Sequence, residues 1–372
     1  MRVNPTEGFS QLFPMNSIST AVQKKSASLT VDGGPTPLVA LRFAIAGIPR
    51  RVRLKLEGKN PTGSSKFRTA KALMTDLEAR RLLRQDSIVI ESTSGNLGVA
   101  LACICQSMGL RFVAIVDPKT TSENISKMRA FGAEIDVVTE ADGSGGFLPA
   151  RLKRLNDLRN ISNRYVWTDQ YSNWANPLAH YMQTGPEILR QSGGSLQAVY
   201  IPVSTGGTLA GTARYLRETS PATLIVGVDA AGSVVFGGKP GVRKLTGIGS
   251  SRRSDFLTSS HYDEFYIVSD REAFPFCRAL LTQTGVELGG SGGAALAACV
   301  RHLEAHPELR DVTCICPDGG ENYRSTIYSD EWLTANGFAL DYAAVATMVA
   351  KQTPEQEADE AIPAQSAVGG SR

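Results

Sequence analysis

The sequence has no long hydrophobic run. No apolar stretch among its 372 residues approaches the roughly 18 that a membrane-spanning helix needs, and the N-terminus has no continuous apolar core of the signal-peptide kind. The charges nearly cancel, because 39 lysines and arginines face 36 aspartates and glutamates, a net charge of +3. This balance offers no strongly basic surface to a nucleic acid or an anionic membrane. We therefore expect a cytoplasmic protein whose partners are neither nucleic acids nor membranes.

Cysteine and histidine are scarce. The first of the six cysteines is residue 103, and the first of the four histidines is residue 180. Cys314 and Cys316 are spaced to share one face of a strand, but two thiols alone do not complete a zinc site. We expect all six cysteines to be buried, reduced thiols, as is usual in the cytosol. We expect no metal ion.

Residues 52–70 have the pattern of a strand, a tight turn and the start of a helix. Apolar and polar residues alternate up to Leu56, and an Asn-Pro-Thr-Gly turn then ends the strand. Ser64 or Ser65 is placed to cap the following helix, so that Lys66 lies in its first turn. The helix dipole disfavours a cation there, which lowers the pKa of the amine and makes it more nucleophilic. An ordinary surface lysine is the alternative. A P-loop is excluded by the spacing of its glycines and lysine.

Predicted strands and helices alternate through most of the chain. We expect strands at 52–56, 87–91, 112–116, 134–138, 198–203, 224–228 and 312–316. We expect helices at 66–83, 99–108, 121–131, 273–284 and 292–304, with others ending near 159 and beginning after 208. This alternation is typical of an α/β fold with parallel strands covered by helices on both faces. In such folds a ligand binds in a cleft at the carboxyl ends of the strands.

Two short loops join predicted strands to predicted helices. The loop 204–208, Ser-Thr-Gly-Gly-Thr, is placed where backbone N–H groups and the helix dipole collect a phosphate. The loop 93–96, Thr-Ser-Gly-Asn, offers a second helix N-terminus to an anion. An ordinary turn between a strand and a helix is the alternative for each.

Five segments resemble, in the same order, motifs of the cysteine synthase and cystathionine β-synthase family. Residues 60–68, Asn-Pro-Thr-Gly-Ser-Ser-Lys-Phe-Arg, are similar to the family's Asn-Pro-Thr-Gly-Ser-x-Lys-Asp-Arg. The loops 93–96 and 204–208 are similar to its Thr-Ser-Gly-Asn and Gly-Thr-Gly-Gly-Thr loops. Gly-Gly-Ser-Gly-Gly at 289–293 and Pro-Asp-Gly-Gly-Glu-Asn-Tyr at 317–323 complete the series. The resemblance implies a fold-type-II pyridoxal 5′-phosphate enzyme, similar to the tryptophan synthase β chain, with two parallel-sheet domains and the active site in the cleft.

The resemblance also implies roles for the matching residues. Lys66 would form the Schiff base with the cofactor and act as the catalytic base. The cofactor would be bound by Lys66, Asn96, Ser204, Thr205, Gly206, Gly207, Thr208 and Ser291. The amino-acid substrate would be bound by Thr93, Ser94, Gly95, Gln170 and Gly247. Two residues depart from the usual family pattern, Phe67 in place of aspartate and Ser204 in place of glycine.

Ser291 bears on the type of reaction. The resemblance places its hydroxyl at the pyridine nitrogen of the cofactor, where a carboxylate would hold that nitrogen protonated. A neutral hydroxyl does not, and elimination of a β-substituent then becomes easier than transamination or racemisation. The resemblance therefore implies a transferase that replaces the β-substituent of an activated L-serine and forms a C–N or C–S bond.

Arg252 and Arg253 follow a Gly-Ile-Gly segment that begins at Gly247. A guanidinium suits a phosphate or carboxylate, whereas an acetyl leaving group needs no cation, so we assign one of the two arginines to the substrate. A solvated charged loop is the alternative. With Phe67 and Ser204, this pattern resembles the branch of the family that makes N-(2-amino-2-carboxyethyl)-L-glutamate from O-phospho-L-serine and L-glutamate. That product leads to 2,3-diaminopropionate in siderophore or antibiotic pathways.

Several alternatives stay open. A cysteine synthase that uses O-acetylserine or O-phosphoserine is the second function, followed by a serine or threonine dehydratase and a non-catalytic binding or regulatory protein. Family members usually pair through the large domain, so the resemblance implies a homodimer. We expect a flexible arm at 1–26, a smaller mobile domain at 60–165, a larger cofactor-binding domain at 27–59 and 166–340, and a disordered tail at 352–372.

Overall fold

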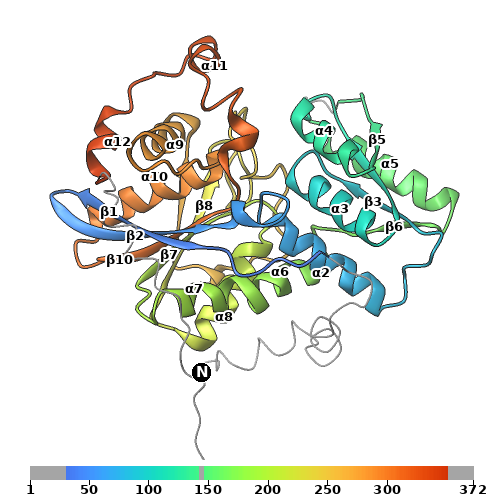
Figure 1. Ribbon diagram of the computed structural model, residues 1–372, viewed down its shortest axis with the longest axis horizontal. Coiled ribbons are helices and arrows are strands. Elements are labelled where there is room, and N and C mark those ends of the chain that lie inside the picture. The colour runs from blue at the N-terminus through green and yellow to red at the C-terminus, as the bar shows by residue number, and fades with distance from the viewer. Residues whose placement is uncertain (1–30, 142–145, 351–372) are drawn as a thin grey trace, which may run out of the picture.

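The chain folds into two sheets that lie side by side, each with helices packed on it (Figure 1). The structure is a computed structural model that describes residues 31–141 and 146–350. The arm predicted at 1–26 and the tail predicted at 352–372 lie outside these residues.

The larger sheet has six strands in the order β1-β2-β10-β7-β8-β9. Only β1 and β2 pair in antiparallel fashion among its neighbouring strands. The strands are β1 Leu38–Ile45, β2 Ile48–Leu56, β7 Ala198–Pro202, β8 Leu224–Ala230, β9 Glu264–Val268 and β10 Asp311–Cys316. The central strands β10, β7 and β8 are buried at nearly every position, because helices cover both faces of the sheet.

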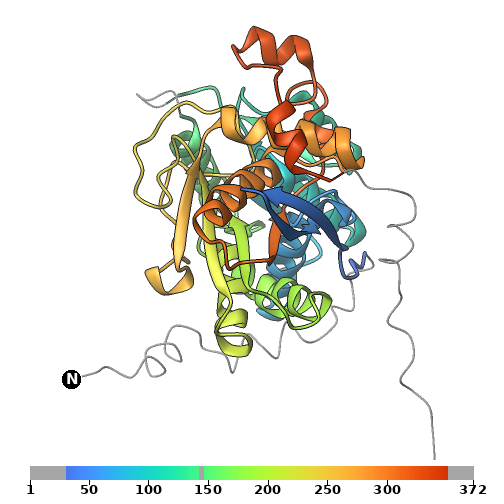
Figure 2. The same cartoon turned by 90° about the vertical axis from the view of Figure 1, so that its left-hand side faces the viewer.

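Helices on the two faces of this sheet belong to separate parts of the core. Helices α9 and α10 pack on one face, and α6, α7 and α8 lie on the other (Figures 1 and 2). Their bounds are α6 Ala175–Ala179, α7 Gly185–Gln191, α8 Gly207–Thr219, α9 Asp270–Thr284 and α10 Gly290–Ala305. A π-helical turn, η2 (His180–Thr184), joins α6 to α7. The remaining helices of this half are α11 Asp330–Ala335, α12 Ala343–Met348, and the 3-10 turns η1 Glu57–Lys59, η3 Ser259–His261 and η4 Gly320–Tyr323.

The smaller sheet has four parallel strands in the order β5-β4-β3-β6. Its elements are β3 Ile88–Ser92, β4 Arg111–Val116, β5 Glu134–Val137, β6 Tyr165–Trp167, α3 Asn96–Ser107, α4 Ser122–Ala130 and α5 Leu148–Ile161. α3 packs on one face and α5 on the other. α2 (Lys66–Ala79) packs against both α3 and α6, so it connects the two halves of the molecule.

The predicted strands and helices are present, with differences at their ends. The helix predicted to run to 83 ends at Ala79, because Arg81 adopts a φ of +56° that no continuing helix allows. The strand predicted at 224–228 continues to Ala230 as β8. Strands β1, β6 and β9 were not predicted, and β1 departs from the expected parallel arrangement.

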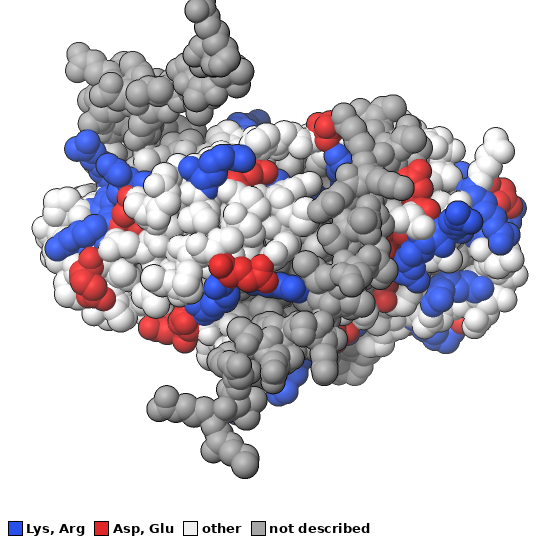
Figure 3. Space-filling model, turned by 90° about the horizontal axis from the view of Figure 1, so that it is seen from below, with Lys and Arg blue, Asp and Glu red and all other residues white. Residues whose placement is uncertain are grey.

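The surface charges, the cysteines and the helices can be compared with what the composition predicted. On the face shown in Figure 3, basic side chains gather at the end that carries the smaller sheet, and uncharged surface covers much of the rest. The six cysteines are unpaired, five of them buried and Cys103 half-buried. Within the described ranges, the structure contains no helix that is both long and apolar enough to cross a membrane.

Candidate active site

The loop before α2 is fixed to the loop after β10. Ser64 and Asp318 form an isolated antiparallel bridge, and the backbone N–H of Ser65 donates to the carbonyl of Pro317 at 2.8 Å. Neither serine caps α2 with its side chain as predicted, since Ser65 has helical backbone angles and makes no capping hydrogen bond. The paired backbone of the two loops, and not a capping side chain, therefore fixes where Lys66 begins the helix.

Lys66 has a lowered pKa. Its side chain is partly buried, and desolvation by burial lowers the pKa of the amine to about 8 against an opposing pull from Glu91. The direction agrees with our prediction, but burial is the largest cause, whereas we expected the helix dipole. Glu91 is fully buried at the end of β3, and burial raises the pKa of its carboxyl to about 7. The sequence did not single out Glu91.

A buried ion network holds α2 in place. The guanidinium of Arg68 donates to Glu57 at 2.7 Å and to both carboxylate oxygens of Glu187 at 2.7 Å. Lys55 also donates to Glu187, at 2.6 Å, and these side chains are at least nine-tenths buried. Breaking one such buried pair costs about 3–5 kcal/mol of folding free energy. Phe67 points elsewhere, into the apolar core beside α3.

The loop 93–96 leads from β3 into α3 and meets two other segments. The hydroxyl of Thr93 accepts a hydrogen bond from the N–H of Gly98 at 3.0 Å, and the amide of Asn96 donates to Asp318 at 2.8 Å. Gln170 donates to the carbonyl of Ser92 at 3.2 Å and is only 7% exposed, so it is not a solvent-facing loop residue. Ser94 and Gly95 lie between these contacts at the start of α3.

The loop 204–208 has the geometry of an anion cradle. Gly206 adopts a left-handed φ of +91° at the N-terminus of α8, which favours glycine. A Cβ on Gly207 would lie 2.2 Å from the side-chain oxygen of Asn176, so only glycine fits there as well. Ser204, the departure from the family pattern, has no left-handed φ, and its hydroxyl donates to the carbonyl of Gly249 at 3.1 Å.

Two side chains connect this loop to the helix of Lys66. Asn176 donates to the hydroxyl of Thr205 at 3.1 Å and accepts from Thr69, one turn after Lys66, at 3.2 Å. His180 lies 3.2 Å from the hydroxyl of Thr208 and 3.4 Å from that of Thr69. Burial lowers the pKa of His180 to about 3, so the ring is neutral at physiological pH. The sequence pointed to neither side chain.

Ser291 and Asn96 both meet Asp318. Ser291 is fully buried in the first turn of α10 and donates to Asp318 at 3.3 Å, while Tyr323 donates to the same carboxylate at 2.6 Å. Burial raises the pKa of Asp318 to about 6, although these donors counteract it. A Cβ on Gly247 would lie 3.8 Å from Asp318, which places the glycine beside this cluster. We predicted Ser291, Asn96 and Gly247 as site residues but not the carboxylate between them.

The structure distinguishes the two arginines. Arg252 stacks over the ring of Tyr171 at 4.9 Å, next to Gln170, and donates to Asp255 at 2.6 Å. Arg253 is exposed, and no hydrogen bond or ion pair of its side chain is found within the described part of the chain. Arg252 therefore has a defined position beside the loop that holds Gln170.

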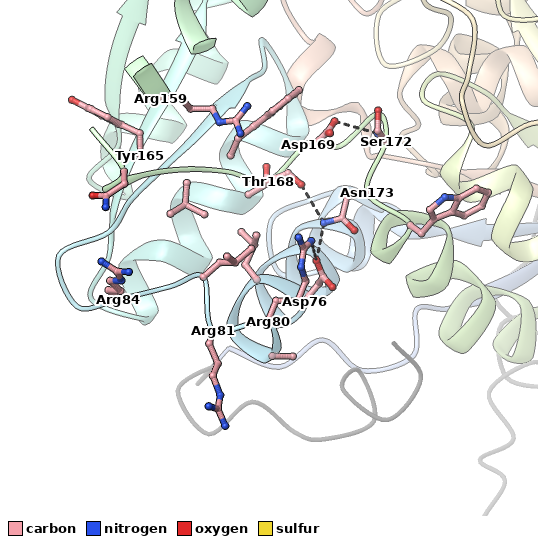
Figure 4. A pocket seen from close by; sticks show the side chains of 17 residues that line it. Asp76, Arg80, Arg81, Arg84, Arg159, Tyr165, Thr168, Asp169, Ser172 and Asn173 are labelled. Carbon is pink, nitrogen blue, oxygen red and sulfur yellow. Dashed lines mark hydrogen bonds and ion pairs between the residues drawn. The ribbon is translucent and has the colours of Figure 1, made fainter. Parts of the chain in front are cut away.

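A separate cavity of about 1080 Å³ opens in the half of the smaller sheet (Figure 4). Its lining includes Arg80, Arg84 and Arg159, and Asn173 within it bonds both Asp76 and Thr168. It includes none of the predicted site residues, and much of its charge belongs to exposed arginines. We do not assign the chemistry to it.

The converging groups fit pyridoxal phosphate. The loop 204–208 offers N–H groups and hydroxyls to a phosphate, and Lys66 has a lowered pKa suited to a carbonyl. The oxygens Thr62 Oγ1 and Ser64 Oγ, in the loop before Lys66, are buried without a hydrogen-bond partner among the described residues. Residues 29–318 match the family described as "Pyridoxal-phosphate dependent enzyme". The chain belongs to this family.

Relatives and solved structures show which named enzymes the chain is similar to. The chain is 41% identical over 304 residues to N-(2-amino-2-carboxyethyl)-L-glutamate synthase of Cupriavidus metallidurans, covering 81% of this chain and 89% of the relative. It is 42% identical over 301 residues to the synthase of the same name from Ralstonia nicotianae, with the same coverage. The O-acetylserine dependent cystathionine beta-synthase from Helicobacter pylori has a TM-score of 0.74 and 31% identity, covering 85% of this chain and 100% of that chain. The predicted family, fold class and cofactor are confirmed, and the chain is a pyridoxal phosphate-dependent enzyme.

Proposed function

We propose that this enzyme joins O-phospho-L-serine and L-glutamate to give N-(2-amino-2-carboxyethyl)-L-glutamate and phosphate. In that reaction the bond from the serine β-carbon to the phosphate oxygen breaks. A bond from the same carbon to the glutamate nitrogen forms, and the amine loses a proton. The relatives with this activity in their names support the choice. The observation that carries it within the chain is the position of Arg252.

The predicted site residues divide into groups by what they would do. Lys66 would hold the cofactor and carry the proton taken from the substrate α-carbon, which its lowered pKa favours. The residues Ser204, Thr205, Gly206, Gly207 and Thr208 would hold the phosphate of the cofactor. Thr93, Ser94, Gly95 and Gln170 would bind the substrate carboxylate, and Asn96 would orient the cofactor ring. When bound, pyridoxal phosphate supplies the electron sink for the α-carbon.

Ser291 and Asp318 favour elimination over competing reactions. The Ser291 hydroxyl donates to Asp318, and it would turn to donate its proton to an unprotonated ring nitrogen when the cofactor is bound. The carboxylate itself is occupied by Asn96, Tyr323 and Ser291, and none of the three carries a charge. With the cofactor bound, the ring nitrogen would thus meet a neutral hydroxyl, as the sequence argument for β-replacement requires.

Arg252 would bind the leaving phosphate. It is held beside Gln170 by Tyr171 and Asp255, and its remaining N–H groups are available because the side chain is 33% exposed. A guanidinium contact to a phosphate is worth about 1.5–3 kcal/mol. An acetyl leaving group would gain little from the same contact, so Arg252 favours phosphoserine over acetylserine.

One assay separates the candidate functions. The holoenzyme is given phosphoserine or acetylserine, each with glutamate or sulfide, and products are measured by mass spectrometry. We expect phosphoserine with glutamate to be the best pair. Arg252→Ala should lower kcat/KM for phosphoserine about tenfold to a hundredfold and leave acetylserine nearly unchanged. Arg253→Ala is the matched control and should change neither, and Lys66→Ala should abolish turnover and the visible colour of the bound cofactor.

Other outcomes of this assay would contradict the proposal. Acetylserine with sulfide as the best pair, unaffected by Arg252→Ala, would identify a cysteine synthase, the alternative function. Release of pyruvate without a second substrate would identify a dehydratase. A colourless protein that does not take up the cofactor would favour a non-catalytic role.

We also propose that the enzyme acts in the cytoplasm as a homodimer. Membership of the family supports these two statements. Light scattering at micromolar concentration should give twice the mass of the 372-residue chain. A monomer mass would refute the dimer.

A further inference from the structure

Two of the four histidines in the chain meet one carboxylate far from Lys66. His302 lies in the last turn of α10, His306 is the C-cap residue that follows this helix, and Glu264 begins the edge strand β9 (Figure 2). The Nε2 atoms of His302 and His306 are 3.6 Å and 3.8 Å from the same oxygen of Glu264. All three ligand atoms lie within 4.8 Å of one another.

The fold brings these groups together and fixes their direction. His306 follows His302 by four positions at the end of α10, and the two rings lie side by side with their centroids 4.2 Å apart. α10 packs across the larger sheet as far as β9, which places Glu264 opposite the two rings. The sequence separates Glu264 from the histidines by a whole helix, which is why we expected no metal ion.

The contacts of the two Nδ1 atoms allow the ring nitrogens that face Glu264 to be acceptors. The Nδ1 of His302 is 2.8 Å from the hydroxyl oxygen of Tyr200, and the Nδ1 of His306 is 3.0 Å from a carboxylate oxygen of Glu308. An Nδ1–H that donates in each of these contacts leaves each Nε2 with a free lone pair. Tyr200 and Glu308 thus hold the two rings as outer-shell partners hold metal-ligating histidines.

A lone pair on His302 has no partner in the protein. His302 is fully buried, and its Nε2 makes no hydrogen bond within the residues that the structure describes. The 3.6 Å to Glu264 is longer than the 2.7–2.9 Å typical of a charge-assisted bond between a ring N–H and a carboxylate. In the tautomer with both protons on Nδ1, three acceptors converge without a proton between them and repel one another unless a cation lies at their centre.

We propose that Glu264, His302 and His306 bind one divalent transition metal ion of the zinc class. Two imidazole nitrogens and one carboxylate are a donor set that Zn²⁺ and Co²⁺ accept, with a water in the fourth position. Bonds of about 2.0–2.1 Å in a tetrahedron place neighbouring ligand atoms about 3.3 Å apart. The 3.6 Å and 3.8 Å from the ring nitrogens to Glu264 require only a small contraction, and Glu264 and His306, which are 45% and 33% exposed at their side chains, leave an entry path.

The ion would clamp the edge strand to the helix that carries Ser291. His302 lies about three helical turns, or about 17 Å, beyond Ser291 along α10. The site is therefore separate from the proposed chemistry, and metal binding should stabilise the fold without taking part in turnover. This inference does not depend on which substrate the enzyme uses.

Metal binding to the holoenzyme tests the proposal. The protein is treated with a chelator, transferred to metal-free buffer and titrated with Zn²⁺ by calorimetry, and with Co²⁺ by visible absorption. We expect one equivalent to bind, tetrahedral Co²⁺ bands to appear, and a hundredfold excess over Kd to raise Tm by about 3 °C. The visible spectrum of the bound cofactor should stay unchanged.

Variants distinguish this site from adventitious binding. His306→Ala and Glu264→Gln remove partly exposed ligands, so the fold is retained, and each should weaken binding at least tenfold. Glu304→Gln is the matched control, since it removes the same charge from an exposed position of α10, and it should bind as the unaltered protein does. Binding that survives both ligand variants, or a holoenzyme that takes up no stoichiometric metal, would overturn the proposal.

Discussion

Lys66 is a buried amine with one carboxylate, Glu91, opposing its loss of charge. The folded-state pKa of about 8 lies below the usual value of 10.5, so folding shifts the equilibrium toward the neutral amine. Below pH 8 the buried charge lowers the stability of the apoenzyme. This cost fades as the pH rises from about 8 to 10.5, because there the unfolded chain binds the proton and the folded chain does not.

Uptake of pyridoxal phosphate by the apoenzyme should therefore follow a pKa near 8. The neutral amine is the nucleophile, so we expect the rate constant to rise about tenfold per pH unit below 8 and to level off above it. The same measurement on a free lysine derivative, which titrates near 10.4, provides the reference. Dividing the two rate constants removes the effect of ionisation of pyridoxal phosphate itself. A midpoint near 10.5 for the enzyme would show that burial does not act on Lys66.

The residues that sequence reasoning missed share one property. Asp318, His180 and Asn176 each contact two or more elements that are distant along the chain. The sequence showed Asp318 within a family motif, but its contacts with Asn96 and Ser291 arise only when three loops meet. Lys66 and the loop 204–208 were visible because a local pattern, a helix start after a turn, already indicates their chemistry.

At the scale of elements, buried and periodic segments were predicted and short or edge strands were not. The strands β3, β7 and β10 are continuous apolar runs in the centres of their sheets. β6 has three residues, too few to show a period, and β9 lies at an edge with exposed Phe265 and Ile267. Edge strands are fixed by one neighbour, so their sequence carries a weaker signal.

The elements around the site are held unequally. α2 is fixed by buried ion pairs through Arg68 and by packing on both halves of the molecule. The loop 204–208 is tied through Asn176 to the same helix. The Arg252 segment, in contrast, is joined to the Gln170 loop by one stacked ring and partly exposed polar contacts. The lysine and phosphate positions are therefore rigid, and the substrate side is the adjustable part.

At the scale of the whole molecule, the two halves share few contacts near the proposed cleft. α4 reaches the segment after β10 through two polar contacts, Lys127 with Asn322 and Ser325 with Glu123 at 3.2 Å. Asn322 also donates to Asn96 at 3.3 Å. Exposed polar contacts of this kind are worth about 0–1 kcal/mol each, which is too little to lock the halves together. Of the predicted mobile domain, 60–165, we propose that the part after the anchored helix α2 moves against the larger domain when substrate binds.

Asn322 offers a test of this closure. Asn322→Ala removes a contact to α4 and one to Asn96, which together are worth about 1 kcal/mol. We expect KM for phosphoserine to rise about fivefold with little change in kcat. The variant destabilises the closed state of the enzyme, which must form before the chemical step. Hydrogen exchange of the unaltered holoenzyme should slow in α4 and in residues 319–325 when phosphoserine is added. Asn336→Ala, in the loop after α11, is the control and should leave KM unchanged, and exchange that is identical with and without substrate would contradict the movement.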